Sequence, residues 1–181
     1  EYRRASWHMD FIYQIGGITK AQDNLKVQFH NEKGDIEFTP AAMRVTGKLK
    51  LEKCIFAEDF TFLRSVARAT PKLTIPSPSM VHYRGGRAAI DPAVYADLEE
   101  FWQDLEQVYA DQIEALGALG CTYLQLDDTS LAYLNDPSQR AYIAGLGGDG
   151  EHQHVTYIRH INAALSKKPT GMRVCTHMCR G

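Results

Sequence analysis

The sequence predicts a mixed α/β fold in which parallel strands alternate with helices. Three short apolar runs, at 73–75, 121–127 and 172–177, are separated by segments long enough for crossover helices. Polar residues follow each run at its carboxyl end, which is where barrel enzymes place their chemistry. A closed (β/α)8 TIM barrel takes roughly 250 residues, so this chain of 181 residues is expected to be the middle portion of such a barrel.

Composition and charge favour a single globular domain spanning residues 1–181. The formal net charge is −2, with both signs interspersed, and 44% of the residues are hydrophobic. We expect neither a nucleic-acid nor a membrane partner, because the chain has no basic stripe and no apolar run of about 18 residues. No signal peptide opens the chain, and its four cysteines lack the spacing of a disulfide framework, which predicts a cytoplasmic location. The oligomeric state stays open, a homo-oligomer included.

A β-hairpin insertion is expected near residues 25–49. Residues 25–30 and 36–39 alternate apolar and polar side chains, as half-exposed strands do, and a glycine-containing turn separates them. Residues 43–49 would extend this hairpin. The segment near Phe29 is counted as a further strand of the barrel.

Three longer helices are predicted from apolar residues that recur at three- and four-residue spacing. The first covers 57–69. The second, about seven turns long, begins at Asp91-Pro92, where Asp is a preferred N-cap and Pro a preferred first residue. The third covers 151–167, and its apolar face would carry Val155, Ile158, Ile161 and Leu165.

Polar side chains at the ends of the first two strands are candidates for substrate binding. Ser77 and Ser79 follow the first strand, in a loop whose prolines oppose helix formation. Asp127 and Asp128 end the second strand. Neighbouring strand residues point in opposite directions, so only one of the two carboxylates faces the barrel mouth. Asp128 can equally cap the following turn.

The third strand ends on His177 and Cys179, a candidate pair of metal ligands. Residues two apart in a strand point the same way, so both side chains can aim at one ion. Imidazole and thiolate are usual ligands of zinc. The alternative is a buried cysteine beside a hydrogen-bonded histidine.

Five stretches of the chain carry a resemblance to a known family. Residues 176–181 (Thr-His-Met-Cys-Arg-Gly) and 124–128 (Leu-Gln-Leu-Asp-Asp) resemble the catalytic barrel of cobalamin-independent methionine synthase. The chain is more similar still to the short single-barrel homologues of that enzyme, which also carry versions of 3–10, 75–80 and 82–87. The similarity therefore runs along essentially the whole chain.

The resemblance implies a zinc-dependent methyltransferase that makes methionine from homocysteine and 5-methyltetrahydrofolate or its polyglutamate. His177 and Cys179 would hold the zinc ion and so be the catalytic residues. Asp127 would bind the amino group of homocysteine, and Glu1 falls where the family has a second acidic residue for this group. Asp128 stands where the longer enzymes have Glu.

The chain departs from the family pattern in two ways. A further Glu and Cys ligand would lie beyond Gly181, so the 181-residue chain alone is expected to bind zinc weakly or not at all and to lack activity. It also lacks the additional N-terminal barrel of the longer enzymes, which leaves the methyl donor open. The alternatives are a related zinc alkyltransferase, with another thiol acceptor or a corrinoid methyl donor, and an inactive barrel fragment.

Overall fold

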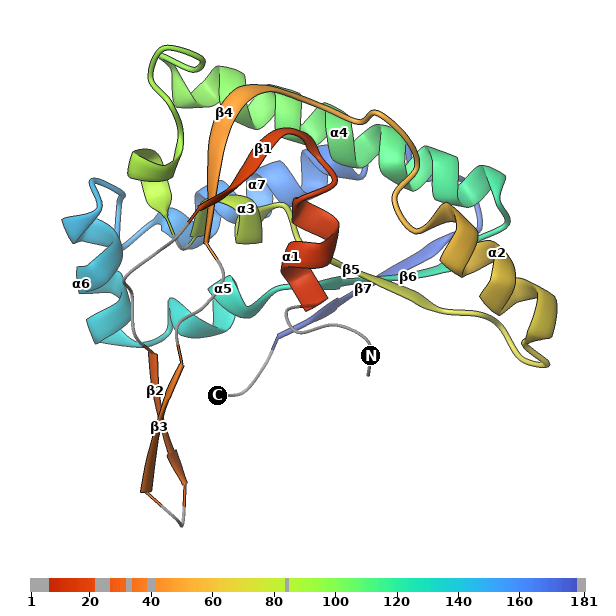
Figure 1. The fold of residues 1–181 in the computed structure, drawn as a ribbon, viewed down its shortest axis with the longest axis horizontal. Helices are drawn as coiled ribbons and strands as arrows, with labels where there is room; N and C mark the ends of the chain where they lie inside the picture. The colour runs from red at the N-terminus through yellow and green to blue at the C-terminus, as the bar shows by residue number, and fades with distance from the viewer. Residues whose placement is uncertain (1–6, 22–26, 32–33, 39–41, 84, 179–181) are drawn as a thin grey trace.

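The computed structural model describes residues 7–21, 27–31, 34–38, 42–83 and 85–178 (Figure 1). The elements are, in chain order, α1 (Trp7–Ile12), β1 (Gly16–Ala21), β2 (Val27–Asn31), β3 (Gly34–Phe38), β4 (Ala42–Lys50), α2 (Ala57–Val66), β5 (Leu73–Pro76), α3 (Ser79–Tyr83), the 3-10 helix η1 (Gly86–Ala89), α4 (Leu98–Ala118), β6 (Tyr123–Asp127), α5 (Thr129–Tyr133), α6 (Pro137–Gly145), α7 (Gln153–Ala164) and β7 (Arg173–His177).

The centre of the fold is a three-stranded parallel sheet with the strand order β5-β6-β7 (Figure 1). One face of the sheet is apolar, because Ile75, Leu124 and Leu126 alternate with more polar neighbours and are buried. Tyr109 of α4 donates a hydrogen bond of 2.9 Å to the carbonyl oxygen of Pro76, which ties this helix to the end of β5. The three predicted strands and their parallel order are confirmed.

The described residues form an open sheet and not a closed barrel. The mixed α/β class is therefore confirmed, and closure of a barrel stays a prediction. The strand near Phe29 does not belong to this sheet: Phe29 lies in β2 and pairs in antiparallel fashion with Ile36 of β3. A hairpin is present as predicted, but the expectation that the segment near Phe29 is a strand of the barrel was wrong.

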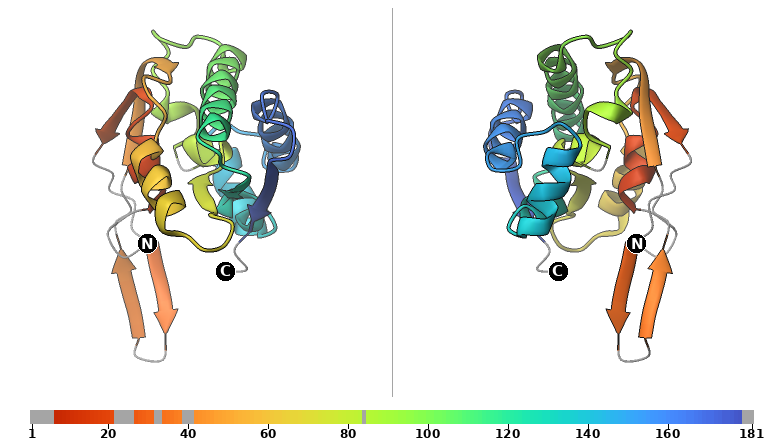
Figure 2. Two further views of the ribbon diagram at one scale, coloured as in Figure 1. Left: turned by 90° about the vertical axis from the view of Figure 1, so that its right-hand side faces the viewer. Right: turned by 90° about the vertical axis from the view of Figure 1, so that its left-hand side faces the viewer.

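The segment that was expected to extend the hairpin pairs elsewhere. Strand β4 pairs in antiparallel fashion with β1, and the β2–β3 hairpin projects from the body beyond this ribbon (Figures 1 and 2). Gly17 lies at an irregularity in β1 with φ of 90°, where an added Cβ would come within 2.5 Å of the Lys48 carbonyl oxygen. Only glycine fits there. Helix α4 lies between the β1–β4 ribbon and α7 (Figure 2).

The long helix α4 begins six residues later than predicted, at Leu98 with Asp97 as its N-cap in place of Asp91. Asp91 instead accepts a hydrogen bond from the Ala93 backbone N–H in a turn. The buried Tyr95 holds this segment, because its hydroxyl accepts from the Leu49 N–H at 2.7 Å and its carbonyl oxygen accepts from Arg87 at 2.8 Å. A carbonyl group occupied in this way is not available to a helix.

The loop expected over 76–79 is shorter than predicted, since helix α3 begins at Ser79. The Met80 N–H donates to the Ser77 carbonyl oxygen at 3.0 Å. Pro78 directly precedes the helix, where its missing N–H costs nothing. The prolines therefore delay this helix and do not prevent it.

A buried cluster of histidine and aromatic side chains joins α3, α4 and α7. The His160 ring stacks on Trp102 at 4.3 Å and hydrogen-bonds to Glu106 at 2.6 Å. The His82 ring lies 5.2 Å from Trp102, and its Nδ1 is joined to the Tyr157 hydroxyl at 2.9 Å. Burial first, and the neighbouring His160 second, lower the pKa of His82 to about 4.

We predict that His82 makes the protein sensitive to acid. The unfolded chain keeps an imidazole pKa of 6.5, so between pH 6.5 and about 4 the unfolded state binds more protons than the folded state. The contribution of neutral His82 is complete above about pH 6.5 and is lost as the pH falls to about 4, with a total near 3 kcal/mol.

Urea unfolding of the protein and of a His82→Gln variant at pH 7 and pH 4.5 measures this effect. The loss of stability on acidification should be smaller in the variant, while a His154→Gln variant, at an exposed position, should behave like the unmodified protein. An equal pH dependence in His82→Gln and the unmodified protein would contradict the assignment.

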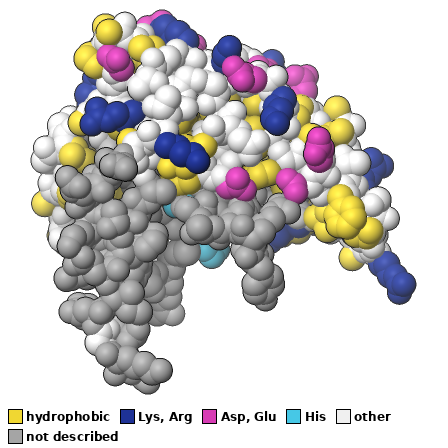
Figure 3. Space-filling view, in the orientation of Figure 1, with side chains coloured by type: hydrophobic (Ala, Val, Ile, Leu, Met, Phe, Trp, Pro, Cys, Tyr) yellow, Lys and Arg dark blue, Asp and Glu magenta, His cyan; other side chains and the backbone are white. Residues whose placement is uncertain are grey.

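The face drawn in Figure 3 shows acidic and basic side chains interspersed over the surface. In the part of the chain that the structure describes, no helix is long and apolar enough to cross a membrane. The thiols of Cys54, Cys121 and Cys175 are not joined in disulfides.

Candidate functional site

The carboxyl edge of the sheet brings the predicted polar stretches together. Pro76, Asp127 and His177 are register partners on β5, β6 and β7. The ladder continues one residue further, because the Ser77 N–H donates to the Asp127 carbonyl oxygen at 2.9 Å and the Asp128 N–H donates to that of His177 at 2.8 Å. Three segments that are about 50 residues apart in sequence therefore end at one edge.

Asp127 and His177 lie on the same face of the sheet, since register partners on parallel strands point the same way. The Asp127 side chain is half-buried and His177 is exposed. The Gln125 amide donates a hydrogen bond of 2.5 Å to Oδ1 of Asp127. This face thus presents a carboxylate beside an imidazole.

Asp128 is wholly buried, with 0% of its surface exposed. Its Oδ2 accepts a hydrogen bond from the Ser79 hydroxyl and its Oδ1 accepts one from the Ser130 hydroxyl, both at 2.5 Å. Its Oδ1 also accepts from the Leu131 N–H at 3.2 Å, so Asp128 is the N-cap of α5. The Ser77 and Ser79 hydroxyl oxygens lie 3.2 Å apart and extend the cluster to the end of β5.

The buried Asp128 carboxylate affects two neighbouring phenols. Burial, and then the negative charge of Asp128, raise the pKa of Tyr109 well above its usual value. The pKa of Tyr157 is raised by burial, then by Tyr83 and Asp128. Both phenols therefore stay neutral and keep their protons for hydrogen bonds.

The structure thus separates the predicted site residues into two groups. Asp127 and His177 share the open face, whereas Asp128, Ser77 and Ser79 form a buried hydrogen-bonded cluster. Glu1 and Cys179 lie outside the described residues. The substrate-binding roles of these residues, and the metal-binding roles of His177 and Cys179, stay predictions.

His177 is a candidate zinc ligand by its chemistry, because imidazole nitrogen is a usual ligand of zinc and this residue ends a strand. Within 7–178, apart from the gaps given above, no three His, Cys, Asp or Glu side chains are grouped so that they could hold a metal ion. The donor chemistry of His177 with Cys179 fits two of the ligands of a zinc site, and further ligands must complete it.

Two residues of the open face were missed by the sequence analysis. Lys72 donates a hydrogen bond of 2.8 Å to the Gln125 side-chain oxygen, and Gln125 in turn donates to Asp127. The signal was present for Gln125, which is two residues before Asp127 in a strand and so shares its face. No local pattern marks Lys72, whose contact depends on how β5 pairs with β6.

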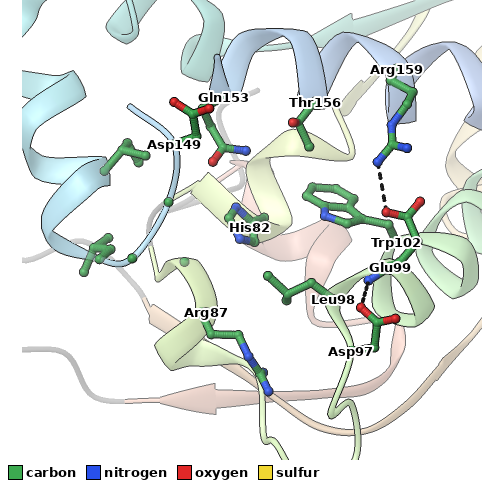
Figure 4. A pocket seen from close by; sticks show the side chains of 15 residues that line it. His82, Arg87, Asp97, Leu98, Glu99, Trp102, Asp149, Gln153, Thr156 and Arg159 are labelled. Carbon is green, nitrogen blue, oxygen red and sulfur yellow. Dashed lines mark hydrogen bonds and ion pairs between the residues drawn. The ribbon is translucent and has the colours of Figure 1, made fainter. Parts of the chain in front are cut away.

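A cavity of about 350 Å³ lies elsewhere, between η1 and the first turns of α4 and α7 (Figure 4). Its charged groups already have partners: Arg159 pairs with Glu99 at 2.9 Å, and Asp97 accepts from the Glu99 N–H. Arg87 donates to two backbone carbonyl groups. These contacts stabilise the walls of the cavity, and its charged side chains therefore contribute to the stability of the fold.

Comparison with known sequences finds relatives but no matching protein-family model. The uncharacterized protein YxjH of Bacillus subtilis (strain 168) is 38% identical over 182 residues, and its uncharacterized protein YxjG is 34% identical over 183 residues. Each match covers 100% of this chain, but 46% of YxjH and 47% of YxjG. The chain therefore spans about half the length of these curated relatives.

Comparison with solved structures also matches this chain to about half of longer proteins. A Listeria monocytogenes protein, provisionally named a vitamin-B12-independent methionine synthase, matches with a TM-score of 0.73 and 34% identity, over 100% of this chain and 48% of that one. A B12-independent methionine synthase from Shewanella sp. W3-18-1, solved with selenomethionine, matches with a TM-score of 0.64 over 98% of this chain and 44% of that one. At 16% identity, the second match shows a shared fold alone.

Proposed function

We propose that the protein carrying this chain is a zinc-dependent methyltransferase that moves a methyl group from 5-methyltetrahydrofolate, or its polyglutamate, to the thiol of homocysteine. The observation that carries the proposal is the register of β6 and β7, in which Asp127 and His177 are partners at the carboxyl edge. Cys179 follows His177 by two residues. The likeness to the Listeria protein along the whole chain supports the same activity.

In this proposal each residue has a separate task. His177 and Cys179 would hold zinc together with ligands from outside the described residues. Zinc, when bound, supplies Lewis-acid activation of a thiol at neutral pH. Asp127, together with Glu1 from outside the described residues, would bind the homocysteine ammonium group by charge and hydrogen bonds.

The bonds exchanged are those of a simple displacement. The homocysteine thiol gives up its proton, and its sulfur forms a bond to the methyl carbon. The bond between that carbon and the folate nitrogen breaks, and the nitrogen takes up a proton. Asp127 contributes by fixing the position of the amino-acid end of the substrate, which aligns the sulfur for attack.

The test is methionine formation by the full-length natural protein, supplied with zinc, homocysteine and methyltetrahydropteroyltriglutamate. Turnover of about 1 s⁻¹ or more is the expected result, because enzymes commonly work at this rate or faster. Turnover with another thiol, or with a methylated corrinoid in place of the folate, would indicate a related zinc alkyltransferase. No turnover with any of these donors and acceptors would contradict the proposal.

We predict that Asp127→Asn raises the KM for homocysteine by about tenfold or more. The substitution keeps the size of the side chain but removes the negative charge that would pair with the ammonium group. Zinc content, measured by elemental analysis, should stay unchanged. Loss of zinc from Asp127→Asn would show instead that Asp127 belongs to the metal site.

A further inference from the structure

We propose that Gln125 and Lys72 are positioning residues that orient the Asp127 carboxylate toward the ammonium group of the amino-acid substrate. The inference rests on the proposed function in one respect, because it takes Asp127 as the residue that binds this group. It adds two residues to the site and predicts that the site prefers a thiol that carries an amino group.

The contacts form a line across the open face of the sheet. Lys72 directly precedes β5, and its Nζ donates to the Gln125 Oε1 at 2.8 Å. The Gln125 Nε2 donates to Oδ1 of Asp127 at 2.5 Å. A positive charge is thus linked through one amide to the negative charge of Asp127.

The chemistry of the three groups permits one orientation of the amide. An ammonium group only donates hydrogen bonds, and an ionised carboxylate only accepts them. Gln125 must therefore turn its oxygen to Lys72 and its NH₂ group to Asp127. Both hydrogen bonds involve a charged group, and such bonds are roughly twice as strong as neutral ones.

This arrangement fixes the rotation of the Asp127 carboxylate. Oδ1 is occupied by Gln125, and among the described residues no hydrogen bond reaches Oδ2. Oδ2 is then the oxygen available to a substrate ammonium group. A carboxylate that is already oriented loses less freedom when the substrate binds, which favours affinity.

Contacts from the neighbouring strands hold this line of residues in place. The Lys72 ammonium lies 5.6 Å from the centre of the Tyr123 ring, within range of a cation–π interaction. On the other side, the Cys175 thiol of β7 lies 3.9 Å from the Gln125 Oε1. Gln125 is thus contacted from both sides, and its position depends on the parallel pairing of β5, β6 and β7.

The test compares two thiols in the full-length natural protein: homocysteine, and 4-mercaptobutanoate, which is homocysteine without its amino group. Calorimetry measures the Kd of each. Gln125→Leu should raise the Kd for homocysteine about tenfold, the effect of losing one charge-assisted hydrogen bond, and leave that for 4-mercaptobutanoate unchanged. Lys72→Met should act in the same direction with a smaller change. In turnover, KM for homocysteine should rise while kcat holds.

Gln107→Leu is the matched control. Gln107 also donates an amide hydrogen bond to an aspartate, reaching Oδ1 of Asp111 at 2.7 Å, but on the exposed surface of α4. This variant should leave the Kd of both thiols unchanged. An equal loss of affinity for both thiols in Gln125→Leu would mean a merely structural role, and no loss for homocysteine would equally overturn the inference.

The two proposals can fail separately. If Gln125→Leu removes a preference for homocysteine over 4-mercaptobutanoate but no methionine forms, the positioning role stands and methyl transfer fails. If methionine forms and Gln125→Leu keeps the preference, the positioning role fails alone. If the unmodified protein binds the two thiols equally, the inference is overturned whatever the reaction.

Discussion

Replacing Cys179 by serine should remove bound zinc and methionine formation together. A serine hydroxyl stays protonated at neutral pH, whereas a thiol becomes the thiolate that zinc prefers. Substitution of residues that hydrogen-bond to metal ligands commonly costs 10–100-fold in metal affinity or activity. Loss of a ligand itself should therefore lower turnover by more than about 100-fold. Elemental analysis and the methionine assay on the full-length natural protein measure both effects.

Cys175→Ser is the matched control for this experiment. Cys175 lies in β7, two residues before His177, and its thiol donates a weak hydrogen bond to the Leu124 carbonyl oxygen that a serine hydroxyl can also make. This variant should keep its zinc. Zinc content in Cys179→Ser equal to that of the unmodified protein would rule out Cys179 as a ligand.

The parallel sheet could be predicted because its strands are short apolar runs separated by helical segments. In β6, Leu124 and Leu126 alternate with Gln125 and Asp127, and the structure buries the two leucines while leaving the two polar residues half-buried. The same alternation shows that Asp127 and Asp128 point to opposite sides. Strand pairing then brings Asp127 beside His177, as expected for strands that end at one edge.

The helix faces were predicted less well, because hydrophobicity alone does not decide which side chains are buried. Val155 and Ile158 of α7 are 54% and 45% exposed, although both were assigned to the inner face. Tyr157 and His160 are buried instead. His160 can be buried because Glu106 satisfies its ring nitrogen and Trp102 stacks on its ring, and both partners come from another helix.

In the site, too, contacts between residues close in sequence could be predicted, and contacts that depend on strand pairing could not. Asp128 follows a strand and precedes two hydroxyl residues, which is a local pattern for an N-cap, and the structure confirms that alternative. That Ser79 would donate to the same carboxylate depends on how β5 and β6 pair. The hydrogen bonds that link Lys72 to Asp127 through Gln125 also depend on the pairing of β5 with β6, and they were not predicted.

Removing the buried carboxylate by Asp128→Ala should destabilise the protein by about 3 kcal/mol or more. Hydrogen bonds to a charged group contribute about 1.5–3 kcal/mol each, and the variant would leave the Ser79 and Ser130 hydroxyls without their acceptor. For a chain of this size, 3 kcal/mol corresponds to a fall in Tm of roughly 6–12 °C. Calorimetry or urea unfolding measures the change.

Asp136→Ala is the control for this prediction, because it removes a helix cap that is exposed where Asp128 is buried. Asp136 caps α6 in the same way, accepting from the Ser138 N–H at 2.7 Å and from its hydroxyl at 2.8 Å, but it is exposed. Loss of an exposed cap costs about 1 kcal/mol. Equal losses in the two variants would mean that the buried cluster adds nothing beyond a cap. An Asp128→Asn protein that keeps its stability but shows a raised KM for homocysteine would instead support substrate binding by Asp128.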